Sequence, residues 1–368
     1  MRRWGIKTGP APAGITARGF CSPGIAKASN QWRPALTRQR SAVGTNHCTI
    51  DGVTKEQYEQ NLEENLGQLL MEIRRGSYHP RASRIVEIPK SDGSLRPLAI
   101  SCFEDKIVQE AVRRIIEAIY EPVFLKCSHG FRSGRGCHTA LIALNRDLMS
   151  WECGAVLEID LRKYFNTIPH EPLVRWLELK ITDRRFLHLI IKLLKAPTLG
   201  EAGEAVRNEV GSPQGSTLSP VLANLYLHHV MDTWFAWTNE SEYGGSARMV
   251  RYADDAVFCF RTLAQAEEFR GLLVKRLGEY GISLNEAKTQ ALISGQGEAA
   301  RYRRLGLKMP SFTFLGFLHV WGISVNRRTC PKRFKRKLSE IKADIRKNRH
   351  KKGLVARVKR VNVPREKL

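Results

Sequence analysis

The chain has 368 residues, 42% of them apolar, which is enough to bury a hydrophobic core and to form two or three subdomains. Its net charge of +24 lies at the two ends: residues 1–50 carry eight Lys/Arg and no acid, residues 326–368 have a net charge of +15, and residues 51–325 retain only +1. No apolar run approaches the length of a membrane span, so the composition points away from a membrane protein. A nearly neutral body between two basic arms favours a nucleic-acid ligand, because each neutralised phosphate releases counterions; the alternative is that the arms are solvated tails that keep the protein soluble.

The eight cysteines form no Cys-x-x-Cys pair and have no histidine at zinc-ligand spacing. We therefore expect free, partly buried thiols in a reducing cytoplasm. The N-terminal arm is basic and poor in acids, as organelle transit peptides are, but it lacks a clear amphipathic period. It is interpreted as an RNA-contacting or disordered arm.

The first predicted element is a helix that begins shortly after Asp51. Thr54 and Gln57 form a capping-box pattern, apolar residues at helical spacing continue to Ile73, and Gly76 ends the helix.

A hairpin is predicted over residues 85–100, because apolar residues flank the turn Ser91-Asp92-Gly93. The hairpin carries two cations, Lys90 and Arg96, on a stiff two-stranded arm. Residues 104–120 then show the apolar stripe of an amphipathic helix.

The remaining chain alternates between short strands and helices without a long series of parallel β-α-β units, which favours an α+β fold over a doubly wound sheet. The expected elements are a buried strand at 155–159, a helix at 218–235 entered through Pro220, two strands joined by a tight turn over 250–260, a helix from Thr262 to Tyr280, and a basic amphipathic helix over 333–349.

Three carboxylates are the main candidates for chemistry. Asp160 ends the apolar strand, and Asp254 and Asp255 occupy the turn between two apolar strands. Asp is common in turns for structural reasons, but like charges packed together raise each other's pKa unless a cation neutralises them. Hard divalent cations bind oxygen ligands, and two such ions can clamp the attacking and leaving oxygens in phosphoryl transfer.

These carboxylates stand among sequence blocks in an order that resembles the reverse transcriptases of bacterial group II introns. The resemblance covers about residues 51–349. Its blocks are Asp51-Gly52-Val53-Thr54, Arg96-Pro97-Leu98-Ala99-Ile100, the helix 105–111, Gly130-Phe131-Arg132-Ser133-Gly134-Arg135, Asp160 with Phe165, Gly211-Ser212-Pro213-Gln214-Gly215, Ser219-Pro220-Val221-Leu222-Ala223-Asn224, Tyr252-Ala253-Asp254-Asp255, Gly281-Ile282-Ser283-Leu284-Asn285 with Lys288-Thr289, and Phe314-Leu315-Gly316-Phe317.

The resemblance implies a right-hand polymerase fold of class α+β, with helical and hairpin fingers and a palm built on an antiparallel sheet. The expected division is a basic, partly disordered extension at 1–50, an N-terminal block and fingers at 51–150, a palm at 151–325 with an inserted fingers segment at about 170–215, and a basic start of the thumb or maturase region at 326–368.

The resemblance also implies a metal site. Asp160 and Asp254 would share two Mg²⁺ ions, for which Mn²⁺ can substitute, Asp255 would be an auxiliary carboxylate, and the main-chain carbonyl of Leu161 would complete the metal shell. The reaction would add dNTPs to a primer 3′-hydroxyl on an RNA template.

Five further residues would bind the dNTP. Phe165 would lie under the sugar and reject a 2′-hydroxyl, Gln214 would face the nascent base pair, Lys90 and Arg96 would hold the triphosphate, and Lys288 would lie near the active site or primer end. The structural alternatives are a core aromatic for Phe165, a solvated strand face for the hairpin cations, and a solvated helix end for Lys288.

Some positions depart from the family pattern. Ser216 replaces a second glycine, Ala256 replaces a bulky residue and is expected to loosen packing under the site, and Asn166 replaces an aspartate. The segment from Lys351 onward resembles solvated charge more than a packed thumb, so we expect a truncated or reduced thumb and no endonuclease domain.

Three other interpretations remain open. The chain could be an RNA-binding maturase fragment without useful polymerisation, motivated by its basic arms, or a stand-alone reverse transcriptase in phage defence. A palm-like nucleotide cyclase is less consistent, because a cyclase needs no Pro-Gln-Gly block. The expected partners are an RNA template, which would be intron RNA, a DNA or RNA primer and dNTPs, in a bacterial cytoplasm.

Overall fold

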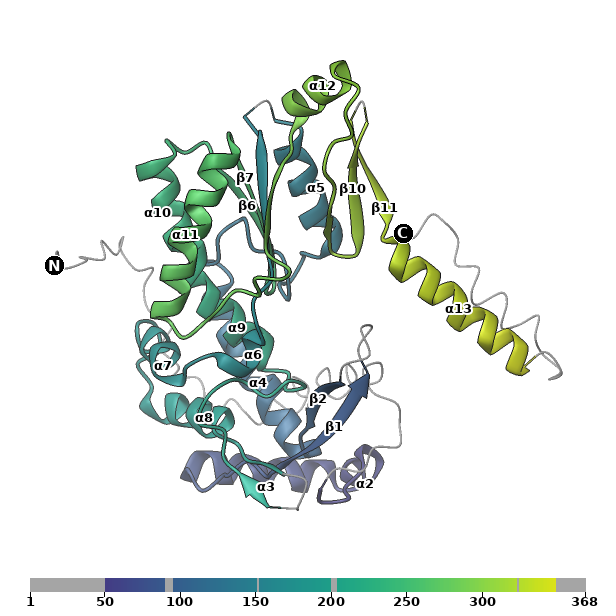
Figure 1. Ribbon diagram of the computed structural model, residues 1–368. Coiled ribbons are helices and arrows are strands. Elements are labelled where there is room, and N and C mark those ends of the chain that lie inside the picture. Colours follow the sequence, from purple (N-terminus) through teal and green to yellow (C-terminus); the bar gives the residue numbers. More distant parts are fainter. Residues whose placement is uncertain (1–49, 90–94, 151, 200–203, 323, 349–368) are drawn as a thin grey trace.

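The computed structural model describes residues 50–89, 95–150, 152–199, 204–322 and 324–348 (Figure 1). Short strands and helices alternate, and among the named strands of these ranges only β1 and β4 pair in parallel. The expected α+β class with antiparallel sheets is therefore confirmed. No helix in the described part of the chain is long and apolar enough to cross a membrane.

The first predicted helix is divided in two, α2 (Lys55–Gln60) and α3 (Leu62–Arg75). The capping box is present: the Thr54 hydroxyl accepts from the Gln57 N–H, and the Gln57 side chain accepts from the Thr54 N–H. Asn61 interrupts the helix at φ −121° and ψ 43°. Asparagine leaves helical geometry at little cost, because its side chain competes for backbone hydrogen bonds. Here Asn61 occupies the N-cap position of α3, without a side-chain capping hydrogen bond.

The predicted hairpin is formed by β1 (Ser83–Pro89) and β2 (Leu95–Ile100), with Arg96 opposite Ile88. Lys90 and the turn at 91–93 lie outside the described residues. The hairpin belongs to a sheet of order β2-β1-β4-β5, to which two short strands contribute. These are β4 (Thr198–Leu199) and β5 (Ala205–Val206), and helix α4 (Phe103–Tyr120) follows β2 directly.

A second, central sheet has the order β6-β7-β3-β8, all antiparallel. Its strands are β3 (Ala155–Ile159), β6 (Arg248–Tyr252), β7 (Asp255–Phe260) and β8 (Gln290–Ile293). Alternate residues of β3 belong to two cores: Leu157 packs in a cluster with Phe269, and Val156 packs in another with Leu144. The sheet therefore lies between α11 (Leu263–Glu279) and α5 (Cys137–Leu148), as Figure 1 shows.

Helices connect the two sheets. They are α6 (Tyr164–Thr167), α7 (His170–Glu178), α8 (Arg184–Leu194), α9 (Ser219–Leu227) and α10 (Thr233–Glu242). The helix predicted to end near residue 235 continues to Glu242, through a π-helical turn, η4 (His228–Asp232), that joins α9 to α10. Asp232 ends this π-helical turn with its side chain fully buried.

The C-terminal part contains a third sheet, with order β11-β10-β9. Its elements are α12 (Gln296–Arg304), β9 (Phe312–Phe314), β10 (Phe317–Trp321) and β11 (Val325–Thr329), followed by α13 (Pro331–Asn348). The predicted basic helix is thus present as α13 and extends away from the central sheet in Figure 1. Its apolar residues Phe334, Leu338 and Ile345 are exposed.

Candidate active site

Asp160 directly follows β3. In the central sheet β3 lies between β8 and β7, and β7 begins at Asp255. Its carboxylate accepts from the Asn285 side-chain amide at 2.8 Å and lies 3.5 Å from the Lys288 ammonium. Its main-chain carbonyl accepts from the Asn285 N–H at 2.7 Å. The segment between α11 (Leu263–Glu279) and β8 therefore fixes both the backbone and the side chain of Asp160.

Asp254 and Asp255 are presented by the turn between β6 and β7. Tyr252 pairs with Asp255, so the two-residue loop consists of Ala253 and Asp254. Ala253 adopts a left-handed conformation, φ +58°, which a two-residue hairpin turn requires but alanine rarely adopts. Because Ile159 on β3 pairs with Ala256 on β7, the register brings Asp160 to the same end of the sheet as this turn.

The three carboxylates affect one another electrostatically. Burial, together with the charges of Asp254 and Asp160, raises the pKa of Asp255 from 3.8 to about 6. Burial likewise raises the pKa of Asp254, Asp160 raises it further, and the cations Arg96 and Arg251 lower it. An anionic cluster of this kind favours the binding of a cation, which would remove the repulsion between its members.

The oxygen donors suit a hard divalent cation, and Leu161, next to Asp160, supplies a main-chain carbonyl. Among the described residues, no three His, Cys, Asp or Glu side chains group closely enough to hold a metal ion by themselves. A hard divalent cation can be bound by one or two carboxylates if water and substrate phosphates supply its other ligands. The donor set therefore fits a metal that is completed by its substrate.

The block from Gly211 to Gly215 is held between β2 and the segment after Asp160. The Gln214 carbonyl accepts from the Ala99 N–H at 2.6 Å, and the Phe165 carbonyl accepts from the Ser212 N–H at 2.7 Å. Gly215 has φ +114°, and a Cβ there would lie 2.5 Å from the Ala99 carbonyl oxygen, so only glycine fits this close approach.

Gln214 and Asn166 are brought together, with the Gln214 amide donating to the Asn166 side chain at 2.9 Å. Both line a cavity of about 200 Å³ that also includes Pro97 and Ala99 of β2. Phe165 is half-buried, and its ring lies 5.6 Å from that of Tyr164. Asn166, noted in the sequence only as a departure from the family pattern, is thus the partner of the predicted nucleotide-binding glutamine.

The structure describes two of the three predicted cations, Lys288 and Arg96. Lys288 contacts Asp160 directly, and the positive charge of Arg96 acts on Asp254 from β2. Lys90 lies outside the described residues.

Two of the departures are accommodated locally. Ser216 donates its N–H to the Pro213 carbonyl and accepts from the Leu218 N–H, so its side chain supports the turn that leads into α9. Ala256 is 1% exposed and packs in the core beside the central sheet, and the expectation of looser packing there stays a prediction.

Sequence reasoning missed two groups. Asn285 belongs to a block that was noted, but its contact with Asp160 spans 125 positions and has no local signal. Arg251 has a local signal, because it is a charged residue between the buried Val250 and the turn that carries Asp254, and its side chain forms a fully buried ion pair with Asp232.

The chain belongs to the reverse transcriptase (RNA-dependent DNA polymerase) family, whose model matches residues 88–319. Among its relatives it is 42% identical, over 171 residues, to the group II intron-encoded protein LtrA of Lactococcus lactis subsp. cremoris, an alignment that covers 46% of this chain and 28% of LtrA. It is 34% identical over 286 residues to Protein YkfC of Escherichia coli K12, covering 68% of this chain and 73% of that protein. The chain thus spans less than a third of LtrA and about three quarters of YkfC.

The fold is also similar to that of an apo telomerase from Candida tropicalis, with a TM-score of 0.52 and 13% identity, over 67% of this chain and 55% of the telomerase chain. The right-hand polymerase fold expected from the sequence is confirmed.

Proposed function

We propose that this chain is an RNA-directed DNA polymerase, a nucleotidyltransferase, of the group II intron type. The observation that carries the proposal is the position of Asp160 and Asp254 at one end of the central sheet, close enough for the charge of Asp160 to raise the pKa of Asp254. Two such carboxylates at adjoining strand ends are the protein's part of a site for phosphoryl transfer.

Asp160 and Asp254 would be the ligands of two Mg²⁺ or Mn²⁺ ions, with the Leu161 carbonyl as a further ligand and Asp255 as an auxiliary carboxylate. When bound, such ions stabilise the attacking and leaving oxygens of an in-line displacement. In that displacement, the primer 3′-oxygen forms a bond to the α-phosphorus of the dNTP, the bond to the bridging oxygen breaks, and pyrophosphate leaves. Lys288 would exchange its contact with Asp160 for the substrate or primer end.

The remaining candidate residues would select and orient the dNTP. Phe165 would lie against the sugar, where its ring leaves no space for a 2′-hydroxyl. Gln214 would face the nascent base pair, and its hydrogen bond to Asn166 supports this role because it fixes the orientation of the amide. Arg96, and Lys90 beyond the described part of the hairpin, would hold the triphosphate.

The domain division follows the elements. Fingers would comprise residues 51–150 together with about 170–215, the palm would comprise the rest of 151–325, and 326–368 would begin the thumb or maturase region. The clamping of residues 211–215 between β2 and the segment after β3 supports this division, because it joins an inserted fingers segment to both parts.

RNA is the proposed template, and two basic surfaces support an extended RNA contact. One is α13, with basic residues along most of its length. The other is a hollow of about 490 Å³ between the end of α3 and the start of α8, whose described lining contains Arg74, Arg75, Arg184, Arg185, His188 and Lys192 and no acidic residue. α8 and α13 lie on opposite sides of the molecule in Figure 1, so one RNA could contact both only by passing around the body. The RNA would be intron RNA, and the six described cysteines, all free, are consistent with a bacterial cytoplasm.

A second candidate function is an RNA-binding maturase role, which the basic hollow favours because it lies apart from the carboxylates. Splicing assistance needs RNA affinity but not Asp160 or Asp254. The two functions can therefore reside in one chain and can be separated by mutation.

Primer extension with the purified chain tests the proposal. We expect incorporation of dNTPs on an RNA template with an annealed primer, dependent on Mg²⁺ or Mn²⁺. A chain that binds the primer–template but incorporates no dNTP with either metal would contradict the polymerase function and leave the RNA-binding role.

A further inference from the structure

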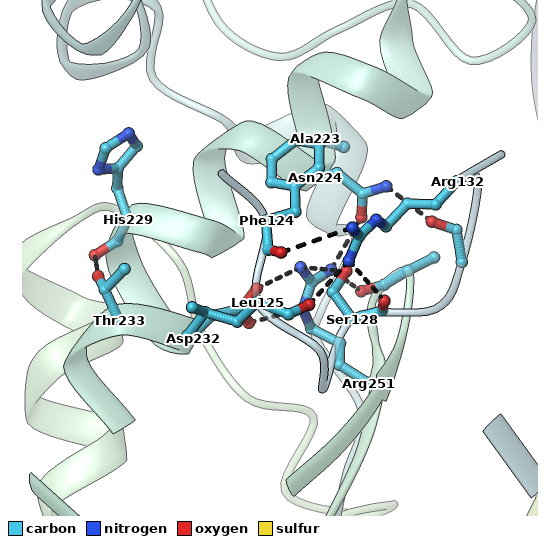
Figure 2. Close-up of polar contacts among 12 residues, drawn as sticks. Phe124, Leu125, Ser128, Arg132, Ala223, Asn224, His229, Asp232, Thr233 and Arg251 are labelled. Carbon is cyan, nitrogen blue, oxygen red and sulfur yellow. Dashed lines mark hydrogen bonds and ion pairs between the residues drawn. The ribbon is translucent and has the colours of Figure 1, made fainter. Parts of the chain in front are cut away.

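A fully buried arginine lies beneath the catalytic turn. The guanidinium of Arg251, on β6, has 0% side-chain exposure, and all five of its N–H donors have acceptors. Two go to the Asp232 carboxylate at 2.7 and 2.6 Å, and the others go to the side chains of Asn224 and Ser128 and to the Ala253 carbonyl, at 2.9, 2.8 and 2.9 Å (Figure 2). These acceptors come from three segments of the chain: the continuous helix α9–η4, the loop at Ser128 and the turn at Ala253.

The ion pair with Asp232 alone would satisfy the buried charge. A bidentate carboxylate contact uses two donors, and water or any nearby carbonyl could accept from the rest. Asp232 belongs to η4, and a π-helical turn within a longer helix is frequently found at a functional site. Here the turn places a fully buried carboxylate against Arg251.

The acceptor that points to function is the Ala253 carbonyl. Ala253 has φ +58°, a strained conformation for a residue other than glycine, and such a conformation persists only where the surroundings enforce it. It immediately precedes Asp254, so its peptide orientation sets the direction of that carboxylate. The hydrogen bond that the Arg251 guanidinium donates to the Ala253 carbonyl fixes the orientation of this peptide.

The opposite side of the turn is held by residues 127–130. The Arg251 backbone donates to the Cys127 carbonyl and accepts from the His129 N–H, both at 2.8 Å. A Cβ at Gly130 would lie 2.4 Å from the Ala253 nitrogen, and the Gly130 carbonyl accepts from Asn224, which in turn accepts from Arg251. The turn is therefore enclosed between the guanidinium and this loop.

We propose that Arg251 is a positioning residue for polymerisation, which orients Asp254 by holding the Ala253 peptide and which joins the turn to residues 127–130 and to Asp232. The proposal rests on the proposed polymerase function. Arg251 touches neither substrate nor metal; it acts through the main chain of the turn.

The alternative is that the Arg251–Asp232 pair only stabilises the fold, and two variants separate these roles. Arg251→Lys keeps a cation beside Asp232, but a single ammonium cannot also reach Ala253, Asn224 and Ser128. The double variant Arg251→Met with Asp232→Leu removes both charges together, and replacing a buried ion pair by apolar residues of similar volume is often neutral for stability. Both variants lose the hydrogen bond to Ala253.

Arg132→Lys is the matched control. Arg132 is a second buried arginine that donates to the Glu121 carboxylate and to the Leu125 and Ser128 carbonyls, and none of these hydrogen bonds involves the turn. Figure 2 shows the two guanidinium groups in the same region. Its substitution removes similar interactions from the same neighbourhood without releasing Ala253.

The measurements are single-nucleotide incorporation, primer–template affinity, thermal unfolding and amide hydrogen exchange of peptides covering residues 252–256. For both Arg251 variants we expect kcat to fall about 10- to 100-fold, as small misplacements of reacting groups produce, with KM for dNTP and primer–template Kd within about twofold of the parent. Exchange in 252–256 should become faster, whereas Arg132→Lys should leave kcat and this exchange close to the parent values.

Three outcomes would overturn the proposal: a folded double variant with the parent kcat, unchanged exchange in 252–256, or a double variant that cannot fold, since the pair would then be a structural requirement of the palm. The hydrogen-exchange result does not depend on catalysis. If the parent chain is inactive, only the polymerase function is refuted. Hydrogen exchange in residues 252–256 would still test whether Arg251 orders the turn.

Discussion

Asn285 donates to Asp160 twice, from its side-chain amide to the carboxylate at 2.8 Å and from its backbone N–H to the carbonyl at 2.7 Å. The Asn285 amide donates to one oxygen of the Asp160 carboxylate, Oδ2, and the same oxygen lies near the Lys288 ammonium. A proposed metal ligand is thus oriented before any metal binds, by a residue that is itself not a ligand.

We expect Asn285→Ala to lower the rate of nucleotide incorporation about 10-fold or more, because a hydrogen bond to a charged group contributes about 1.5–3 kcal/mol. The affinity for primer–template should not change. Single-turnover incorporation measures the rate, and Glu286→Ala is the neighbouring control, since Glu286 pairs with Arg270 at the surface. Equal rates for Asn285→Ala and Glu286→Ala would contradict the orienting role.

Removal of either proposed metal ligand should have a much larger effect. Asp160→Asn and Asp254→Ala should each reduce dNTP incorporation about a thousandfold or more, while RNA affinity is retained, because a shared ligand contributes several kcal/mol to transition-state stabilisation. Glu178→Gln, an exposed carboxylate on α7, is the control and should extend primers normally. Normal extension by Asp160→Asn would exclude the two-metal mechanism for this chain.

The pKa of Asp255 provides a test that does not depend on activity. Because burial, Asp254 and Asp160 raise this pKa from 3.8 to about 6, the folded chain holds the proton more tightly than the unfolded chain does. The stabilising contribution is therefore complete below about pH 4 and is lost as the pH rises through about 6.

In metal-free buffer near pH 7.5, Asp255→Asn should thus be more stable than the parent, by about 2 kcal/mol, and near pH 4 the difference should vanish. Added Mg²⁺ should raise the melting temperature of the parent more than that of the variant, since the cation offsets the repulsion that the variant lacks. Chemical and thermal unfolding at the two pH values, with and without Mg²⁺, measure both effects. A variant that is less stable than the parent near neutral pH would show that the cluster is not electrostatically strained.

The parts of the candidate site that local patterns can predict are those that depend on neighbouring residues. Asp160 follows an apolar strand and Asp254 occupies a turn between two such strands, so both could be placed at strand ends from the sequence alone. Strand order and register decide whether those ends meet, and these depend on pairings between residues about a hundred positions apart, such as Ile159 with Ala256. The resemblance of the ordered sequence blocks to those of reverse transcriptases predicted the meeting of these strand ends, which periodicity could not.

Buried polar partners are the least predictable part. Arg251 and Asp232 lie 19 positions apart, and each would be expected at the surface from its residue type; only the tertiary packing makes them a pair. The continuation of α9 through η4 to Glu242 has a similar origin, since tertiary contacts override weak local preferences.

Sugar discrimination depends on Phe165. Phe165→Ala should admit ribonucleotides, because removal of the ring opens space beside the sugar and breaks no hydrogen bond. The ratio of kcat/KM for rNTP to that for dNTP should rise about 10-fold or more. Phe334→Ala, which removes an exposed ring from α13, is the control. An unchanged rNTP/dNTP ratio in Phe165→Ala would show that Phe165 is a packing residue and does not select the sugar.

The basic segment 351–368, which lies outside the described residues, should contribute RNA affinity without affecting nucleotide choice. Its cations are Lys351, Lys352, Arg357, Lys359, Arg360, Arg365 and Lys367, against the single acid Glu366. If about half of them contact phosphates, deletion should reduce the slope of log affinity against log salt concentration by about three, since each contact contributes roughly 0.7–0.9. Binding of a labelled primer–template across a series of salt concentrations measures the slope, and the rNTP/dNTP ratio of the truncated chain is the control. A slope equal to that of the full chain would mean that these cations remain solvated and contact no RNA, and the affinity would then be assigned to α13 and to the basic hollow between α3 and α8.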